Sequence, residues 1–444
     1  MSNLFRRIPG KAYPIAVRAQ GCDIWDQSGK RYLDASGGAC VVTIGHGVRD
    51  IAKAVAEQME SLSFVHGSHF VTGAACELAA RIAGLSADPH LNRVYLVSGG
   101  SEAVETAVKL ARQYWREAGR PDRYKVLSRW TSYHGNTMGA LALGGHTGRR
   151  RHYLPLMLHT PHIEPCYCYR CPFGRDRGSC GLECAHALER TLLYEGPDSV
   201  AAFIAEPVVG ASAGALVPPP GYWPLIREIC DRHSVLLISD EVMTGAGRTG
   251  LPLALDHWGV AADLVALAKG LSSGYAPLGA VLCRESIHEV IKDGSGEFVH
   301  GFTYCQHPVA AAAGVAVLRH LEENKLVERS REMGKYLLQR LLTLKDSPLV
   351  GDVRGLGLLA ALEFVADKER KTTFDPAEKV AGRVAAKAFA LGLITYPGSG
   401  GADGMRGDHL LLCPPFIIKE EEIDFLVDTV GAACRAVERE LSRR

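Results

Sequence analysis

The sequence has almost no net charge and no long apolar stretch, and each absence excludes a class of protein. Its 50 lysines and arginines are balanced by 49 aspartates and glutamates. No basic block extends beyond Arg149-Arg150-Arg151, so no nucleic-acid partner is expected. An uncharged stretch, residues 209–226, contains four prolines and cannot form a membrane-spanning helix. No apolar segment follows the basic residues near the start, so no signal peptide is predicted. We therefore expect a cytoplasmic protein with no membrane partner.

The sequence also gives no sign that the fold depends on disulfide bonds. At about 150 residues a domain, the 444 residues suggest two or three domains, which are large enough to bury their own cores. Disulfide frameworks belong to small secreted chains, so the 13 cysteines are expected to be reduced. What the sequence has in excess is glycine, with 48 residues, or about 11% against a norm of about 7%. Many of these glycines stand beside Ser, Asp or Lys, which indicates backbone shaped around a ligand.

Short apolar runs alternate with helical patterns in the middle of the chain. Helices are predicted over 101–118 and 221–233, where apolar residues recur at helical spacing. Buried strands are predicted over 93–97, 200–205, 235–239, 264–268 and 279–283. Continuous apolar strands that alternate with helices indicate an α/β domain with a mostly parallel sheet covered on both faces.

The two ends of the chain have a different pattern. A polar hairpin is predicted over 22–36, turned at Ser28-Gly29. Later in the chain we predict one long helix from about 310 to 344, strands over 355–364 and 409–413, and helices over 376–391 and 419–442. These elements predict a small α+β domain built from both termini. The predicted bounds are 1–59 for the N-terminal part of the small domain, 60–320 for the large domain, and 321–444 for the C-terminal part of the small domain.

The first candidate site is Ser98-Gly99-Gly100-Ser101, between a predicted strand and a predicted helix. Glycines allow a ligand to approach the backbone, and a helix start offers free N–H groups and a positive dipole end. A phosphate is the natural ligand, with the Ser101 hydroxyl as a further donor. The alternative is an ordinary helix cap made by Ser101.

Two further candidates end buried strands. Asp240 follows one strand, where ligands bind in open α/β sheets, or it caps a neighbouring loop. Lys269 follows another, and burial there would lower its pKa and free a neutral amine for a Schiff base. The alternative is a lysine that emerges into solvent. Together with the glycine loop, these are the parts that pyridoxal 5′-phosphate (PLP) needs: a phosphate site, a partner for the ring nitrogen, and an amine for the aldehyde.

Several motifs in order make the chain recognisable over nearly its whole length. They are Ser98-Gly-Gly-Ser-Glu-Ala103, Tyr133-His-Gly-Asn-Thr-Met-Gly139, Ala205-Glu-Pro207, Asp240-Glu-Val242 through Gly-Arg248-Thr-Gly250, Ala268-Lys-Gly270 and His300-Gly-Phe-Thr303. The chain resembles the class III (ω-amino acid type) PLP aminotransferases of fold type I. The resemblance implies a large, mostly parallel-sheet PLP-binding domain and a small α+β domain from both termini.

The resemblance also assigns roles to particular residues. It implies that Lys269 forms the internal aldimine with PLP and acts as the catalytic acid and base. The other implied cofactor residues are Gly100 and Ser101 at the phosphate, Tyr133 stacked on the ring with His134 beside it, Val242 on the opposite face, Asp240 at the ring nitrogen, and Glu206 near the cofactor. Thr303 matches a residue that reaches the phosphate of the neighbouring subunit, so a homodimer with active sites at the subunit interface is implied.

The implied activity is the transfer of an amino group from an amine or ω-amino acid to pyruvate or 2-oxoglutarate by a ping-pong mechanism. An aminomutase or racemase of the same fold stays an alternative, because the motifs around the cofactor are shared. A non-enzymatic relative is the third, and the presence of Lys269 and Asp240 argues against it. The physiological amine donor stays open.

Two substrate-binding residues are predicted with less support from the pattern. Arg406 stands where the resemblance places a mobile arginine for the substrate carboxylate, although an arginine in a surface loop would look the same. Ala39 and Cys40 occupy a stretch where relatives often carry a bulky aromatic residue, which would leave a roomier pocket.

A cysteine cluster follows His162, at Cys166, Cys168, Cys171, Cys180 and Cys184. Dense cysteines can bind zinc, but this spacing matches no standard zinc module. Reduced loop thiols or an occasional disulfide are the other interpretations, and no metal site is predicted.

Overall fold

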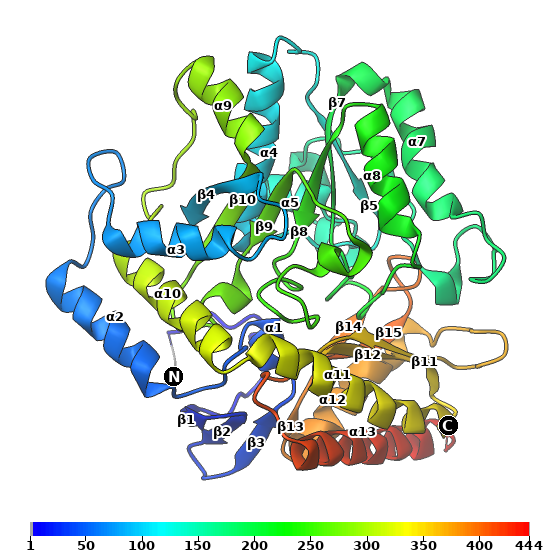
Figure 1. Ribbon diagram of the computed structural model, residues 1–444. Helices are drawn as coiled ribbons and strands as arrows, with labels where there is room; N and C mark the ends of the chain where they lie inside the picture. The colour runs from blue at the N-terminus through cyan, green and yellow to red at the C-terminus, as the bar shows by residue number, and fades with distance from the viewer. Residues whose placement is uncertain (1–2, 444) are drawn as a thin grey trace.

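The computed structural model describes residues 3–443, and a seven-stranded sheet lies at its centre (Figure 1). The strand order is β4-β10-β9-β8-β7-β5-β6. The strands are β4 (Leu91–Val97), β5 (Lys125–Arg129), β6 (His162–Ile163), β7 (Val200–Ala205), β8 (Leu236–Asp240), β9 (Leu264–Leu267) and β10 (Gly279–Arg284). Strands β5 to β9 run parallel to one another, whereas β10 is antiparallel to both its neighbours. The predicted α/β fold with a mostly parallel sheet is therefore confirmed.

Helices cover both faces of this sheet, because successive strand side chains point to opposite sides and both sets are apolar. In β7, Phe203 belongs to one buried cluster, and Ala202 and Ile204 belong to the other. One cluster includes α4 (Gly100–Glu117), α5 (Met138–Leu143) and α9 (Glu285–Asp293). The other includes α3 (Gly73–Ala83), α7 (Glu183–Glu195), α8 (Tyr222–Arg232) and α10 (Pro308–Glu323). Helix α2 (Arg49–Ser61) packs on α10.

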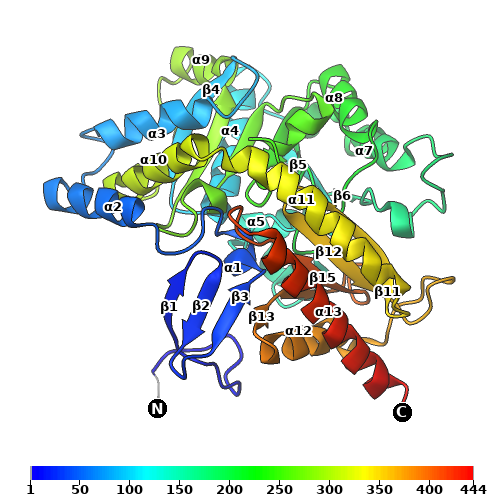
Figure 2. The same ribbon diagram turned by 60° about the horizontal axis from the view of Figure 1, so that its bottom comes forward.

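Two smaller sheets take their strands from the first and last parts of the chain (Figure 2). The first has the order β1-β2-β3-β13, with β1 (Ala16–Gln20), β2 (Asp23–Asp26), β3 (Arg31–Asp34) and β13 (Leu393–Ile394). The second has the order β11-β12-β15-β14, with β11 (Val350–Leu356), β12 (Leu359–Phe364), β14 (Tyr396–Ser399) and β15 (Asp408–Leu412). Helices α11 (Leu326–Leu342), α12 (Val380–Ala390) and α13 (Glu420–Leu441) pack with these strands. The domain bounds stay a prediction, and residues 1, 2 and 444 within them lie outside the described residues.

Two short helices and several 3₁₀ turns complete the described elements. The short helices are α1 (Gly37–Cys40) and α6 (Thr147–Arg150). The 3₁₀ turns are η1 (Leu154–Leu156), η2 (Cys168–Arg170), η3 (Pro197–Ser199), η4 (Ala254–Trp258), η5 (Lys269–Leu271), η6 (Thr343–Asp346) and η7 (Pro376–Glu378). No helix within residues 3–443 is long and apolar enough to cross a membrane.

Three sequence expectations are corrected by the structure. The single helix over 310–344 is two helices, α10 and α11, because Lys325 has a φ of +50°, which interrupts the helix after Asn324. The segment 355–364 is the turn and second strand of a hairpin, because Gly357 has a φ of +57° and a Cβ there would overlap the backbone of Thr249. The cysteines are not all reduced, since Cys40 and Cys413 form a disulfide that joins segments 373 residues apart.

Candidate active site

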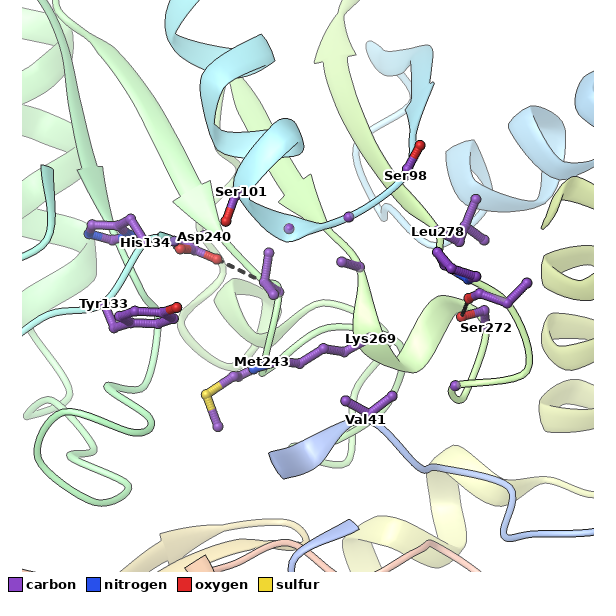
Figure 3. A pocket seen from close by; sticks show the side chains of 18 of the residues that line it. Val41, Ser98, Ser101, Tyr133, His134, Asp240, Met243, Lys269, Ser272 and Leu278 are labelled. Carbon is purple, nitrogen blue, oxygen red and sulfur yellow. Dashed lines mark hydrogen bonds and ion pairs between the residues drawn. The ribbon is translucent and has the colours of Figure 1, made fainter. Parts of the chain in front are cut away.

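A cavity of about 420 Å³ lies between the start of α4 and the carboxyl ends of the central strands (Figure 3). Its lining comes from segments that are far apart in the sequence, which the parallel sheet brings to one edge. Eight of the predicted cofactor residues line it together: Gly100, Ser101, Tyr133, His134, Glu206, Asp240, Val242 and Lys269.

The start of α4 forms one wall of this cavity. Gly99 is the residue before the helix, and no side chain caps the helix there. Gly100 packs closely on Val242, because a Cβ there would lie 2.9 Å from Cγ1 of Val242. The Ser101 hydroxyl accepts a hydrogen bond from the N–H of Asn136 at 3.0 Å. The first N–H groups of a helix have no partner within the helix, so this wall suits an anion such as phosphate.

Asp240 ends β8 and presents a buried carboxylate to the cavity. One oxygen accepts the N–H of Val242 at 3.0 Å. The other lies 2.7 Å from Nδ1 of His134, whose side chain is fully buried. Each oxygen keeps a further lone pair, so the carboxylate can accept a hydrogen bond from a ligand in the cavity.

Glu206 is a buried carboxylate that accepts backbone hydrogen bonds. Its oxygens accept the N–H groups of Gly210 at 3.2 Å and Tyr133 at 3.4 Å. Burial raises the pKa of Glu206 to about 7; His134 opposes this shift and the charge of Asp240 adds to it. Glu206 therefore fixes the backbone that carries Tyr133.

Lys269 begins η5 directly after β9, and its side chain points into the cavity. Burial lowers the pKa of Lys269 to about 8, although the negative charges of Asp240 and Glu206 oppose this. Its φ of +42° is rare for a residue with a side chain, and such strained backbone is concentrated at functional sites. The amine is therefore available in its neutral form near pH 8, as a nucleophile or base requires.

A second cavity of about 640 Å³ shares Tyr133, Met243 and Lys269 with the first. Arg149 lies in its lining, with its guanidinium carbon 4.2 Å from the centre of the Tyr133 ring. The sequence reasoning missed Arg149, and it missed Val41 and Met243 in the first cavity. Only the basic run at 149–151 could have drawn attention to Arg149.

Three predicted residues do not line either cavity. Thr303 is exposed in the loop before α10. Arg406 is also exposed and pairs with Asp403 at 2.6 Å. Cys40 is buried and bonded to Cys413, and its neighbour Ala39 lines the second cavity instead. The roles predicted for Thr303 and Arg406 stay predictions, whereas Cys40 does not present a free thiol to substrate.

The cysteine cluster lies apart from the active site. All five thiols are free, and they line a small cavity against Pro219. Within residues 3–443, no three His, Cys, Asp or Glu side chains form a group that could hold a metal ion.

The fold and the site define a transaminase, and the comparisons with known proteins agree. The family model for class-III aminotransferases matches residues 9–434, so the chain belongs to the class III aminotransferase family. The uncharacterized aminotransferase YodT of Bacillus subtilis (strain 168) is 41% identical over 434 residues, which cover 97% of each chain. The putrescine–pyruvate aminotransferase of Pseudomonas aeruginosa is 38% identical, covering 97% of this chain and 92% of the relative.

Two solved structures similar to this chain are also transaminases. An (S)-enantioselective ω-transaminase from Thermomicrobium roseum is 38% identical, with a TM-score of 0.92 over 98% of this chain and 96% of the other. A PLP-bound amine transaminase from an uncultivated Pseudomonas species is 36% identical, with a TM-score of 0.92 over 98% and 99%. The chain therefore has the fold type I architecture of these enzymes.

Class III aminotransferases use PLP, and the chemistry of the first cavity fits this cofactor. A Cβ on Gly99 would meet no atom within 4 Å, so there is open space at the helix start for a phosphate. The cavity also holds a buried carboxylate, an amine with a lowered pKa and an aromatic ring in Asp240, Lys269 and Tyr133. These groups match the ring nitrogen, the aldehyde and the ring face of PLP.

Proposed function

We propose that this chain transfers an amino group from an amine or ω-amino acid to pyruvate or 2-oxoglutarate, with PLP bound in the first cavity. The observation that carries the proposal is the convergence of Asp240 and Lys269 on one cavity beside the start of α4. Each comes from the end of a different central strand, and the parallel sheet brings the two side chains together.

The proposed cofactor contacts follow from the lining of the cavity. Gly100 and Ser101 would bind the phosphate at the helix start, with Thr303 of the partner subunit. Tyr133 and Val242 would hold the ring between them. Asp240, oriented by His134, would keep the ring nitrogen protonated. This arrangement requires a homodimer, which stays a prediction together with the cytoplasmic location.

When bound, PLP supplies an electron sink for the negative charge that develops at the substrate Cα. Lys269 would take the proton from the substrate Cα and deliver it to C4′ of the cofactor. Its lowered pKa, about 8, keeps part of the amine neutral near physiological pH, which a base needs. The cofactor would carry the amino group from the donor to the acceptor, so the first product would leave before the acceptor binds. Ping-pong kinetics are therefore expected.

The test is turnover of an amine panel with pyruvate or 2-oxoglutarate, compared between wild type and Lys269→Ala. We expect turnover in the wild type that depends on the acceptor, and a loss of more than about 100-fold in the variant. Borohydride reduction should attach a pyridoxyl group to Lys269 of the wild type, as found by peptide mass spectrometry. Turnover by a folded Lys269→Ala protein would refute the role of Lys269. Conversion of an amino acid without any acceptor would instead identify a racemase or aminomutase.

A further inference from the structure

The three consecutive arginines at 149–151 have different surroundings. Arg150 is buried, with its guanidinium carbon 5.2 Å from the centre of the Trp130 ring. Arg151 is exposed and lines neither cavity of the site. Arg149 lies between them in the sequence but lines the second cavity, against the ring of Tyr133. Only Arg149 of the three therefore faces the space next to Lys269.

Arg149 has no acidic partner to compete with a ligand. In the part of the chain that the structure describes, no carboxylate lies within 4.0 Å of Arg149. Arg354 shows the contrast, since it lies 2.9 Å from Asp352 and 2.7 Å from Glu363. Arg149 is held instead by the face of Tyr133 at 4.2 Å. A guanidinium that stacks on an aromatic ring keeps its N–H groups free for two parallel hydrogen bonds to a carboxylate.

The second cavity has the electrostatics of an anion site. Its lining contains Arg7, Arg149 and His152, and no Asp or Glu. The positive charge of Arg149 also reaches the reactive amine, since Arg149 is one of the charges that lower the pKa of Lys269. A second ammonium group on a diamine would meet only positive charge here, whereas a carboxylate would meet an unpaired guanidinium.

We infer that Arg149 binds the carboxylate of the substrate, so that the second cavity selects amino acids and oxo acids over diamines. This inference rests on the proposed transaminase function and adds the substrate class. It assigns to Arg149 the part that the sequence predicts for Arg406. Arg406 is satisfied by Asp403 at 2.6 Å and does not line the cavity.

The experiment measures the donor half-reaction of the holoenzyme by the absorbance change of its cofactor, without an acceptor. Three donors differ only at the far end of a four-carbon chain: 4-aminobutanoate, butylamine and 1,4-diaminobutane. In the wild type we expect 4-aminobutanoate to react fastest. Arg149→Gln should lower its rate constant at low concentration by about 10- to 100-fold, because one charge-assisted pair is lost. The same variant should change the rate with butylamine by less than about threefold.

The control variants separate binding from structure. Arg151→Gln removes the same charge from the neighbouring exposed position and should leave all three donors unchanged. Arg149→Lys keeps the charge without the planar fork and should recover part of the rate with 4-aminobutanoate. If Arg149 only supports the Tyr133 ring, Arg149→Gln lowers the rate with all three donors equally, and the inference fails. It also fails if Arg406→Gln, and not Arg149→Gln, causes the selective loss.

A binding measurement completes the test. Glutarate has two carboxylates but no amine or carbonyl, so it binds without reacting. Calorimetric titration of the holoenzyme should give a dissociation constant for glutarate that rises at least about 10-fold in Arg149→Gln and is unchanged in Arg151→Gln. Equal affinity in wild type and Arg149→Gln would overturn the inference. A wild type that turns over no amine with any acceptor would contradict the proposed function instead.

Discussion

Glu241 gives a sharp test of the electrostatics in this fold, because it is buried next to the site without taking part in it. It follows Asp240 directly, but its side chain is 1% exposed and points away from the first cavity. Oε1 accepts the N–H groups of Ala254 at 2.7 Å and Leu255 at 3.1 Å, and Oε2 accepts the hydroxyl of Thr244. Burial nevertheless raises the pKa of Glu241 from 4.5 to about 7.

The raised pKa of Glu241 makes the free energy of unfolding depend on pH, and its direction fixes whether stability rises or falls. A carboxyl with a folded pKa above its unfolded pKa is stabilising in its neutral form. This contribution is complete below pH 4.5 and is lost as the pH rises through about 7. The interval between these two values, at about 1.36 kcal/mol per pH unit, corresponds to about 3 kcal/mol. Glu241→Gln stays neutral at every pH, keeps the acceptor for Ala254 and Leu255, and can donate to Thr244.

We therefore expect Glu241→Gln to match the wild type at pH 4.5 and to be more stable by up to about 3 kcal/mol at pH 8. The assay compares urea midpoints and melting temperatures of the two proteins at both pH values. Glu440→Gln is a control of opposite sign. Hydrogen bonds from Lys387 and Arg383 lower the pKa of Glu440 to about 2, so its loss should destabilise the protein at pH 8. A Glu241→Gln protein that is less stable than wild type at pH 8 would refute the reasoning.

Three other predictions concern packing, the cofactor site and the cysteine cluster. Gly334→Ala should destabilise the protein by about 1–3 kcal/mol, because its Cβ would overlap the backbone of Gly357, whereas Gly382→Ala has open space and should not lower the melting temperature. Asp240→Asn should lower the pKa of Lys269 below about 8, because the negative charge of Asp240 raises that pKa. The pH dependence of Lys269 acetylation in the apoprotein measures the pKa. An unchanged acetylation midpoint would contradict the prediction. Chelator-washed protein should contain no stoichiometric zinc at the five clustered cysteines, and elemental analysis showing one zinc per chain would contradict this.

Much of the site could be predicted because its signals are local. A glycine pair before a helix, a carboxylate after one apolar strand and a lysine after another each depend on a few neighbouring residues. Parallel strands place their carboxyl ends at one edge of a sheet, so the order of these signals was enough to bring Asp240 and Lys269 to one cavity.

The errors concern contacts between distant segments or single backbone angles. Lys325 breaks a continuous helical pattern through one left-handed residue, which side-chain periodicity does not report. Arg149 and Arg151 are the same residue type two positions apart, and only the packing of α6 decides that Arg149 meets Tyr133.

The sequence by itself determined the α/β class, the family and the residues proposed to hold the cofactor, since strand patterns, glycines and strand-end charges act over short range. Only the tertiary structure decided which arginine faces the substrate space and which cysteines meet. Cys40 and Cys413 are 373 residues apart, and Arg149 depends on a ring sixteen positions earlier, so these contacts exist only once the sheets and helices have packed. Packing therefore places the arginine proposed to bind substrate, whereas the local sequence was enough to single out Lys269.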